Sequence, residues 1–267
     1  MPIECSVEIT KLTTDEFKEL DYVVMRHAFD SQNCLGRLAD ERIYQSDLAH
    51  RLSSAGLDVK REIPLRLSHG NFCKVHFLDL VVAEQAVYEL KAVKGLTDEH
   101  VGQLLTYLYL LDLPRGKLIN FRSVAVETRF VNAPLCLADR RAFSVDTSDY
   151  CGHADFADLV VGLTRDWGTS LTLALYKEAI VELLGGPEIA EAMVPLERSR
   201  FPLGNQRFQM ASNDTAFRLT AMNRETSEYQ LQLVRLLALS PLRAIHWINV
   251  AHHKVTLKTI STTCNPF

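Results

Sequence analysis

The stretch from Phe77 to Tyr107 constrains the fold of this chain most, because charged residues interrupt two strongly apolar runs. The first run carries Asp79, and after a polar break at residues 83–85 the second run carries Glu89 and Lys91. Side chains alternate between the two faces of a strand, so Glu89 and Lys91 share one face. Two apolar runs joined by a tight polar break predict a β-hairpin, which would bring Asp79 alongside Glu89.

Such a cluster of charges needs a partner, because charged side chains rarely lie within apolar strands unless they are paired or bind a metal. Two neighbouring carboxylates repel each other, and a hard divalent cation with oxygen ligands, such as Mg²⁺, relieves that repulsion. An amine beside the cation orients a water molecule or neutralises charge on a phosphate. The alternative interpretation is a simple salt bridge at the edge of a sheet.

The segment after the predicted hairpin has the features of a helix. Residues 97–99, Thr-Asp-Glu, combine a capping residue with acidic residues in the first turn. Gln103 and Tyr107 are four residues apart and therefore share a face of this helix. A Gln-x-x-x-Tyr element that follows a D…E-x-K hairpin resembles the PD-(D/E)XK nuclease superfamily.

A second motif lies upstream, between residues 35 and 44. It resembles the signature of the GxxExxY proteins, a branch of the same superfamily, which is usually LGPGLLESVY. Four residues match in place, namely Leu35, Gly36, Glu41 and Tyr44. Two depart from it, since Leu38 replaces the named glycine and Arg37 replaces a proline. Residues 89–93, 96–108 and 118–121 also resemble this family, so the resemblance spans about residues 10–130.

The resemblance implies an α/β fold, a restriction-endonuclease-like mixed sheet flanked by helices. It implies hydrolysis of phosphodiester bonds in DNA or RNA, with DNA favoured, and with Mg²⁺ or Mn²⁺ as cofactor. The implied metal ligands are Asp79, Glu89 and the Leu90 carbonyl. The implied catalytic residues are Glu41, Asp79, Glu89, Lys91 and Gln103, and the implied substrate-binding residues are Tyr44 and Tyr107.

The second half of the chain repeats the apolar pattern of the first half. Residues 176–186 follow the pattern of 44–56, residues 217–222 that of 88–93, residues 229–241 that of 102–114, and residues 247–250 that of 118–121. The charged residues are not kept in the second half. In the alignment of the two halves, Leu173 takes the place of Glu41, Phe208 lies near the place of Asp79, Arg218 takes that of Glu89 and Thr220 that of Lys91. We therefore expect a tandem duplication whose second copy lacks the catalytic residues. The alternative is a coincidence between two α/β segments of similar period.

These patterns predict three regions: a nuclease-like domain at 1–131, a linker at 132–154 and a degenerate repeat at 155–267. We expect a monomer in which the two halves form an intramolecular pseudo-dimer. The strand expected at residues 59–67 contains Pro64, which favours an edge position. The second copy would serve as a packing partner or as a substrate-binding surface.

Composition limits the compartment and the partners. No apolar run reaches the roughly 18 residues of a membrane span, and the six cysteines form no C-x-x-C pair. Both features predict a cytoplasmic protein with no membrane partner and with reduced thiols that are buried and inert.

The charge of the chain bears on its function. It carries a net charge of −4, and neither half is strongly basic, which counts against a nuclease that grips long DNA. Two other functions remain open. One is a non-catalytic protein- or nucleic-acid-binding module on a nuclease-like scaffold. The other is a metal-free dimerisation module, in which Asp79 and Glu89 would lie more than about 8 Å apart.

Overall fold

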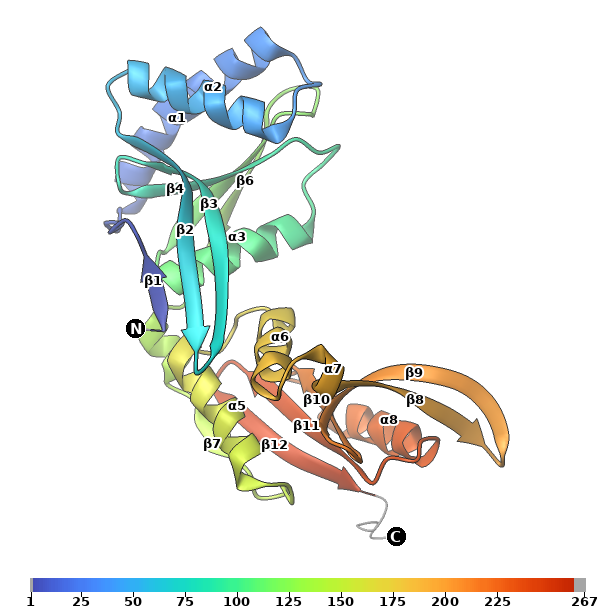
Figure 1. Cartoon of the computed structure of the whole chain (residues 1–267). Coiled ribbons are helices and arrows are strands. Elements are labelled where there is room, and N and C mark those ends of the chain that lie inside the picture. Colours follow the sequence, from blue (N-terminus) through green and yellow to red (C-terminus); the bar gives the residue numbers. More distant parts are fainter. Residues whose placement is uncertain (1, 262–267) are drawn as a thin grey trace. The chain divides into compact units, whose positions relative to one another are not determined.

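The computed structural model describes residues 2–261 and contains two six-stranded mixed sheets with helices (Figure 1). Contacts between residues divide the chain into two compact units. The first unit comprises Met1–Ser68 and Cys73–Leu137, and the second comprises His69–Phe72 and Ala138–Phe267. The two units are described separately below.

In the first unit the strands follow one another across the sheet in the order β1-β2-β3-β4-β5-β6. Strands β4 and β5 are parallel, whereas the pairs β1–β2, β3–β4 and β5–β6 are antiparallel. The elements are β1 (Ile3–Cys5), α1 (Thr14–Leu35), α2 (Glu41–Ser54), β2 (Val59–His69), β3 (Phe72–Val82), β4 (Ala86–Lys91), α3 (Asp98–Leu111), β5 (Arg115–Asn120) and β6 (Glu127–Asn132).

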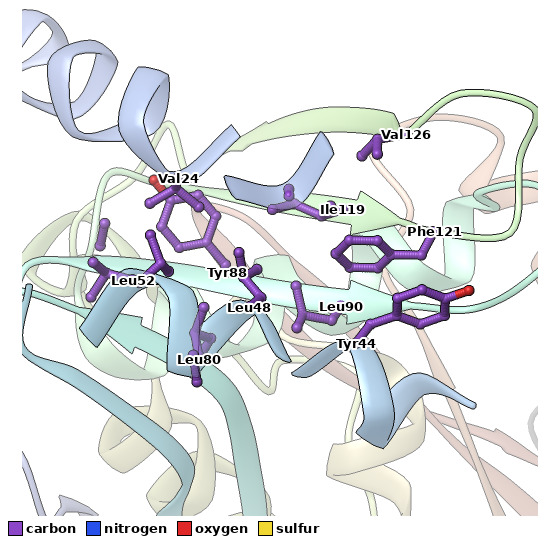
Figure 2. Packing of buried hydrophobic residues seen from close by; sticks show 14 of the residues in the cluster. Val24, Tyr44, Leu48, Leu52, Leu80, Tyr88, Leu90, Ile119, Phe121 and Val126 are labelled. Atoms are coloured by element: carbon purple, nitrogen blue, oxygen red, sulfur yellow. The ribbon is translucent and has the colours of Figure 1, made fainter. Parts of the chain in front are cut away.

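Helices α1 and α2 pack on one face of this sheet and enclose its main core (Figure 2). Alternate residues of β4, Tyr88 and Leu90, are fully buried against these helices, as is Leu80 of β3. Figure 1 shows α3 on the other face of the sheet. A side chain at Gly116 of β5 would lie 3.1 Å from Leu108 of α3, so this helix packs closely. Residues that flank Tyr88 and Leu90 in β4 therefore point toward the α3 side.

The predicted hairpin is present as β3 and β4. Leu80 pairs with Tyr88 and Val82 pairs with Ala86, so continuation of this register sets Asp79 opposite Glu89. The turn residues Ala83 and Glu84 have φ values of 57° and 54°. Residues 83–85 form the loop, and the Gln85 N–H donates to the Val82 carbonyl at 3.1 Å, so Ala83 and Glu84 are the central residues of a tight β-turn.

Pro64 does not lie on an edge strand, contrary to the sequence-based expectation. Strand β2 lies between β1 and β3. The short β1 pairs with residues Leu65 to Leu67 only, with Cys5 opposite Leu65. Pro64 therefore lies just beyond the end of this ladder, where no backbone N–H is required of it.

The second unit has the strand order β7-β12-β11-β10-β9-β8. Strands β10 and β11 are parallel and are connected through α8, as β4 and β5 are connected through α3. Its elements are α4 (Leu137–Arg141), β7 (Ser144–Asp146), α5 (Ala154–Trp167), α6 (Leu173–Leu183), α7 (Pro187–Ala190), β8 (Glu191–Arg198), β9 (Phe201–Ser212), β10 (Thr215–Thr220), α8 (Thr226–Ala238), β11 (Ala244–Ala251) and β12 (Lys254–Ser261).

The segment predicted as a linker contains ordered structure, because α4 and β7 lie within it. Strand β7 pairs in parallel with β12. Arg140 of α4 is fully buried and donates to the backbone carbonyl oxygens of Thr169 and Trp167 at 2.8 and 2.5 Å. A buried guanidinium that bonds to backbone carbonyls fixes this segment to the second unit.

The cysteines differ from their expected burial. Cys34, Cys73, Cys136 and Cys151 are exposed, and Cys5 is half-buried. Cys264 and the rest of residues 262–267 of the predicted repeat lie outside the described part of the chain. Within residues 2–261, every helix is too short or too polar to cross a membrane.

Two hydrogen-bond motifs occur once in each unit. Asn120 Oδ1 accepts from the Val93 N–H at 3.0 Å while its amide donates to the Val93 carbonyl at 2.9 Å. Asn249 makes the same pair of bonds with Met222, at 2.7 and 2.9 Å. Likewise, the Tyr44 hydroxyl donates to the Gly36 carbonyl, and the hydroxyl of Tyr176 donates to the Gly168 carbonyl.

Candidate active site

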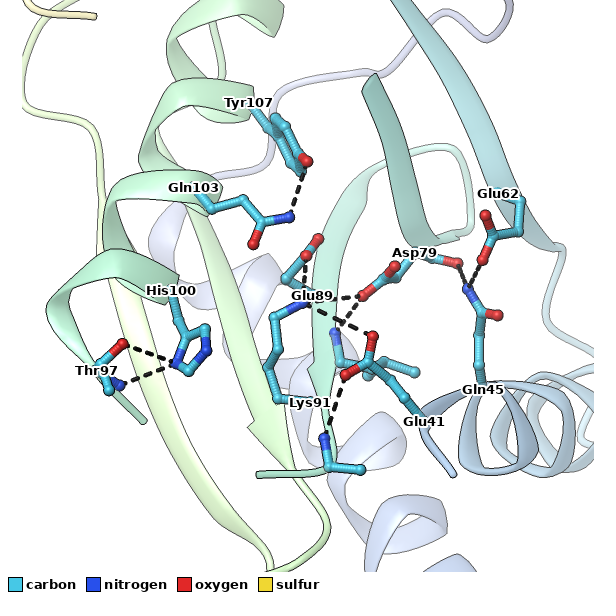
Figure 3. Close-up of polar contacts among 12 residues, drawn as sticks. Glu41, Gln45, Glu62, Asp79, Glu89, Lys91, Thr97, His100, Gln103 and Tyr107 are labelled. Atoms are coloured by element: carbon cyan, nitrogen blue, oxygen red, sulfur yellow. Dashed lines mark hydrogen bonds and ion pairs between the residues drawn. The ribbon is translucent and has the colours of Figure 1, made fainter. Parts of the chain in front are cut away.

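The ammonium group of Lys91 lies at the centre of a group of three carboxylates (Figure 3). Its Nζ is 2.7 Å from Glu89 Oε1 and 3.9 Å from Asp79 Oδ2. Glu41 Oε1 is also 3.9 Å away. Both carboxyl groups lie within 4 Å of one ammonium, so they are less than about 8 Å apart. The wider separation that the metal-free dimerisation module predicted is therefore wrong.

Asp79 and Leu90 are linked across the end of the hairpin. The Leu90 N–H donates a 2.7 Å hydrogen bond to Asp79 Oδ2. The N–H and C=O of one residue in an antiparallel strand point toward the same neighbouring strand. The carbonyl of Leu90 therefore also faces the strand that carries Asp79.

Glu41 reaches the site from the first turn of α2. Its Oε2 accepts a 3.3 Å hydrogen bond from the Ala92 N–H, just after the end of β4. Its side chain is 41% exposed, whereas that of Glu89 is 1% exposed. The site thus has a solvated side at Glu41 and a dry side at Glu89.

Burial changes the acidity of the two inner carboxyl groups. Desolvation raises the pKa of Asp79 to about 6, although the hydrogen bond from Leu90 opposes this shift. Desolvation and then the charge of Asp79 raise the pKa of Glu89 to about 8. Both shifts mean that the cost of burying these carboxylates exceeds the stabilisation that Lys91 and the hydrogen bonds give their charged forms.

Lys91 remains a cation in this environment. Burial alone would lower its pKa, but the charge of Glu89 and the hydrogen bond to it raise the pKa above the usual lysine value. Glu89 Oε2, in contrast, is buried and has no hydrogen-bond partner among residues 2–261. A buried carboxyl oxygen without a partner is rare in a native protein and calls for a further partner, such as a water molecule or a cation.

Gln103 and Tyr107 of α3 contact each other at the side of this group. The Gln103 amide donates a 2.9 Å hydrogen bond to the Tyr107 hydroxyl. Burial raises the pKa of Tyr107 to about 12, and the charges of Glu89 and Asp79 add to the shift. The Tyr107 hydroxyl therefore stays protonated and can donate a hydrogen bond to an acceptor.

Tyr44 lies in the core and not in the site. Its side chain is fully buried, and its ring stacks on that of Phe121 with centroids 4.5 Å apart. Its hydroxyl donates to the Gly36 carbonyl at 2.7 Å. The predicted substrate-binding role of Tyr44 therefore has no support in this geometry, because no part of the side chain is accessible to a substrate.

A buried amide behind Asp79 was not found by sequence reasoning. Gln45 is 2% exposed, and its amide donates to the Asp79 backbone carbonyl at 2.8 Å and to Glu62 Oε1 at 2.9 Å. The Arg61 guanidinium donates to the side-chain oxygen of Gln45, Oε1, at 3.1 Å. Glu62 has a φ of 50°, which a non-glycine residue rarely adopts. The only sequence signal for a role of Gln45 is its position directly after Tyr44 of the upstream motif.

The residues of the second unit that the sequence pattern aligned with the candidate catalytic residues have different chemistry. Continuation of the β9–β10 register sets Phe208 opposite Arg218, and the Arg218 guanidinium lies 5.1 Å from the centre of the Phe208 ring. The Thr220 hydroxyl donates to Asn249 Oδ1 at 2.7 Å. Leu173 is the first residue of α6, as Glu41 is the first residue of α2.

The donor set for a metal is small. Within residues 2–261, no three His, Cys, Asp or Glu side chains are arranged to hold a metal ion together. The available oxygen donors are the carboxylates of Asp79 and Glu89 and the backbone carbonyl of Leu90. A set of this size is not specific to Mg²⁺, and any divalent cation there would need water molecules or substrate phosphates as further ligands.

Comparison with known proteins supports a superfamily for part of the chain. Residues 18–131 match the family model of the PD-(D/E)XK nuclease superfamily. The matched segment includes most of α1, all of α2 and α3, and all the side chains around Lys91. No curated protein and no solved structure matches the chain.

Proposed function

We propose that the first unit is a divalent-metal-dependent nuclease that hydrolyses phosphodiester bonds in DNA, with Mg²⁺ or Mn²⁺ held by Asp79, Glu89 and the Leu90 carbonyl. The observation that carries this proposal is Glu89 Oε2, which is buried and has no hydrogen-bond partner within residues 2–261. The raised pKa values of Asp79 and Glu89 support it, since a second cation would relieve the repulsion between these groups. When bound, the metal would supply Lewis-acid polarisation of the phosphate.

The side chains around the metal ligands have distinct parts in this proposal. Lys91, which stays protonated, stabilises the negative charge that develops on the phosphate or holds the attacking water. Glu41, at the solvated side, accepts a hydrogen bond from that water. The Tyr107 hydroxyl donates a hydrogen bond to a phosphate oxygen, and Gln103 positions that hydroxyl. Tyr44 has only a structural part, in the core.

The experiment compares cleavage and metal binding in matched variants. Lys91→Ala should reduce cleavage of labelled DNA with Mg²⁺ or Mn²⁺ by a factor of 10² or more. Lys94→Ala removes an exposed lysine three residues away and should cleave as the wild type does. Asp79→Asn and Glu89→Gln should abolish Mn²⁺ binding measured by calorimetry. Circular dichroism of each variant should show that the fold is kept.

Two results would reject this function. One is a wild-type protein that binds neither Mg²⁺ nor Mn²⁺. The other is a Lys91→Ala protein that cleaves DNA at the wild-type rate, because the activity would then come from elsewhere.

The second unit supports a second candidate, a non-catalytic binding module on the same scaffold. We infer that it is a degenerate copy of the first unit. The shared order of helices and of the parallel strand pair supports this, as do the recurring contacts of Asn120 and Asn249. In the second unit, Phe208 and Arg218 take the places of the carboxylates Asp79 and Glu89. A cation and an aromatic ring at these positions favour binding over catalysis. DNA binding without metal-dependent cleavage by the whole chain would favour this candidate.

A further inference from the structure

Positive charge is concentrated in one part of this acidic chain. Residues 191–261 carry nine Lys and Arg against five Asp and Glu, a net charge of +4. Residues 1–190 carry 20 against 28, a net charge of −8. The overall charge of −4 therefore conceals a basic segment, and that segment includes β8 to β12 of the second unit.

The hairpin of β8 and β9 extends beyond the rest of its sheet (Figure 1). We call its outer part, residues 195–207, the arm. Strand β10 pairs with residues 209–212 of β9 only, so the arm is a ribbon of two strands. A register shift between Leu196 and Glu197 and a φ of 128° at Gly204 mark a bulge, which bends such a ribbon.

The arm has a fixed position at its base. The Glu197 N–H donates a 2.8 Å hydrogen bond to the carbonyl of Leu239, just after α8. The ribbon ends in a two-residue turn at Ser199 and Arg200, whose φ values are 51° and 67°. A short turn of this kind suits a rigid hairpin.

The outer end of the arm exposes both cationic and apolar side chains. Every residue from 197 to 205 is exposed. Phe201 is 68% exposed and Leu203 is 51% exposed, although their burial would stabilise the fold. The guanidinium groups of Arg198 and Arg200 form no ion pair or hydrogen bond with any residue in 2–261, although the Arg198 backbone pairs with Phe201. Large exposed apolar side chains beside unpaired arginines mark a contact surface.

We propose that the arm binds single-stranded nucleic acid, with Arg198 and Arg200 on successive phosphates and the Phe201 ring stacked on a base. Arginine favours phosphate because its guanidinium makes paired hydrogen bonds with the oxygens. Aromatic stacking together with a cationic groove is the usual way in which proteins bind single strands. Only the choice of nucleic acid as partner rests on the proposed nuclease function; the binding itself needs no metal and no cleavage.

The experiment measures binding of the full chain to a labelled 20-nucleotide single strand by fluorescence anisotropy, in EDTA so that no strand is cut. Arg198→Ala/Arg200→Ala should weaken binding at least tenfold at low salt. The slope of log affinity against log salt should become shallower by about 1.4, since each lost phosphate contact contributes about 0.7 for single strands. Phe201→Ala should weaken binding by roughly ten- to a hundredfold with an unchanged salt slope.

Two controls separate the arm from charge in general. Arg165→Ala/Lys177→Ala removes two exposed cations from α5 and α6 and should keep the wild-type affinity. Arg198→Lys/Arg200→Lys keeps the charge and should retain the salt slope. A blunt duplex of the same sequence should lose affinity with the arginine variant but not with Phe201→Ala.

The outcomes for the arm and for the nuclease are distinguishable. Wild-type affinity in Arg198→Ala/Arg200→Ala overturns the inference even if the protein binds Mn²⁺ and cleaves DNA. Equal loss in the α5 and α6 control also overturns it, because the effect would then be non-specific. Arm-dependent strand binding without any Mn²⁺ binding supports the arm and rejects the nuclease.

Discussion

The side-chain amide of Gln45 donates a 2.8 Å hydrogen bond to the backbone carbonyl of Asp79, so that helix α2 fixes the position of strand β3 at the candidate site. The same amide contacts Glu62, and Gln45 is 2% exposed. Gln45 bonds to the backbone carbonyl of Asp79, and it makes no hydrogen bond to the Asp79 carboxylate that would bind the metal. It is therefore a positioning residue, which acts through the backbone of Asp79.

Gln45→Met, which keeps the length of the side chain but removes its amide, should weaken Mn²⁺ binding by the factor of 10 to 100 that is typical of supporting hydrogen bonds. Calorimetry measures this change directly. The free energy of unfolding should fall by about 1–2 kcal/mol, which urea denaturation checks. An unchanged Mn²⁺ affinity would show that Gln45 supports only the fold.

Tyr44→Phe provides the matched comparison, because Tyr44 is the neighbour of Gln45 and is also buried. Loss of the 2.7 Å bond to the Gly36 carbonyl should cost about 1 kcal/mol of unfolding free energy. Mn²⁺ affinity and the KM for DNA should not change, since the ring lies in the core. A raised KM would restore the substrate-binding role that the sequence resemblance implied.

Alternation of apolar and charged residues was sufficient to predict the β3–β4 hairpin and the meeting of Asp79, Glu89 and Lys91. Alternation says nothing about Gln45, because a buried polar residue within a helix has no periodic pattern of its own. The place of Pro64 was also hidden, since it depends on where the short β1 ends. Contacts between distant segments, rather than local preference, decided these two features.

The ion pair of Lys117 and Asp21 is another contact between distant segments, and it is buried. Lys117 Nζ lies 2.6 Å from Asp21 Oδ2, and the two residues are 4% and 7% exposed. Lys117→Met should leave the Asp21 carboxylate without its partner and cost about 3–5 kcal/mol. Thermal unfolding followed by circular dichroism measures this loss. Lys117→Met/Asp21→Leu should recover most of the stability, and a double variant as unstable as the single one would contradict the ion-pair explanation.

His246 makes the stability of the second unit depend on pH. It is 7% exposed, its Nδ1 lies 3.1 Å from Thr259 Oγ1, and burial lowers its pKa to about 4, helped by the charge of Arg243 and by His153. The rings of Tyr150 and Phe156 also pack on it. The unfolded chain, in which the pKa of histidine is about 6.5, therefore binds a proton more readily than the folded chain.

The sign of the effect follows from this difference. The contribution of neutral His246 to the free energy of unfolding is fully present above about pH 6.5, and it is lost as the pH decreases toward 4. Because His246 is partly solvated at the edge of a pocket, we expect a loss of about 1–2 kcal/mol between pH 7 and pH 5. Both tryptophans, Trp167 and Trp247, belong to the second unit, so urea denaturation followed by tryptophan fluorescence reports on this unit. His246→Gln cannot be protonated and should show a smaller decrease over the same range, whereas an equal decrease in both proteins would assign the pH dependence to other groups.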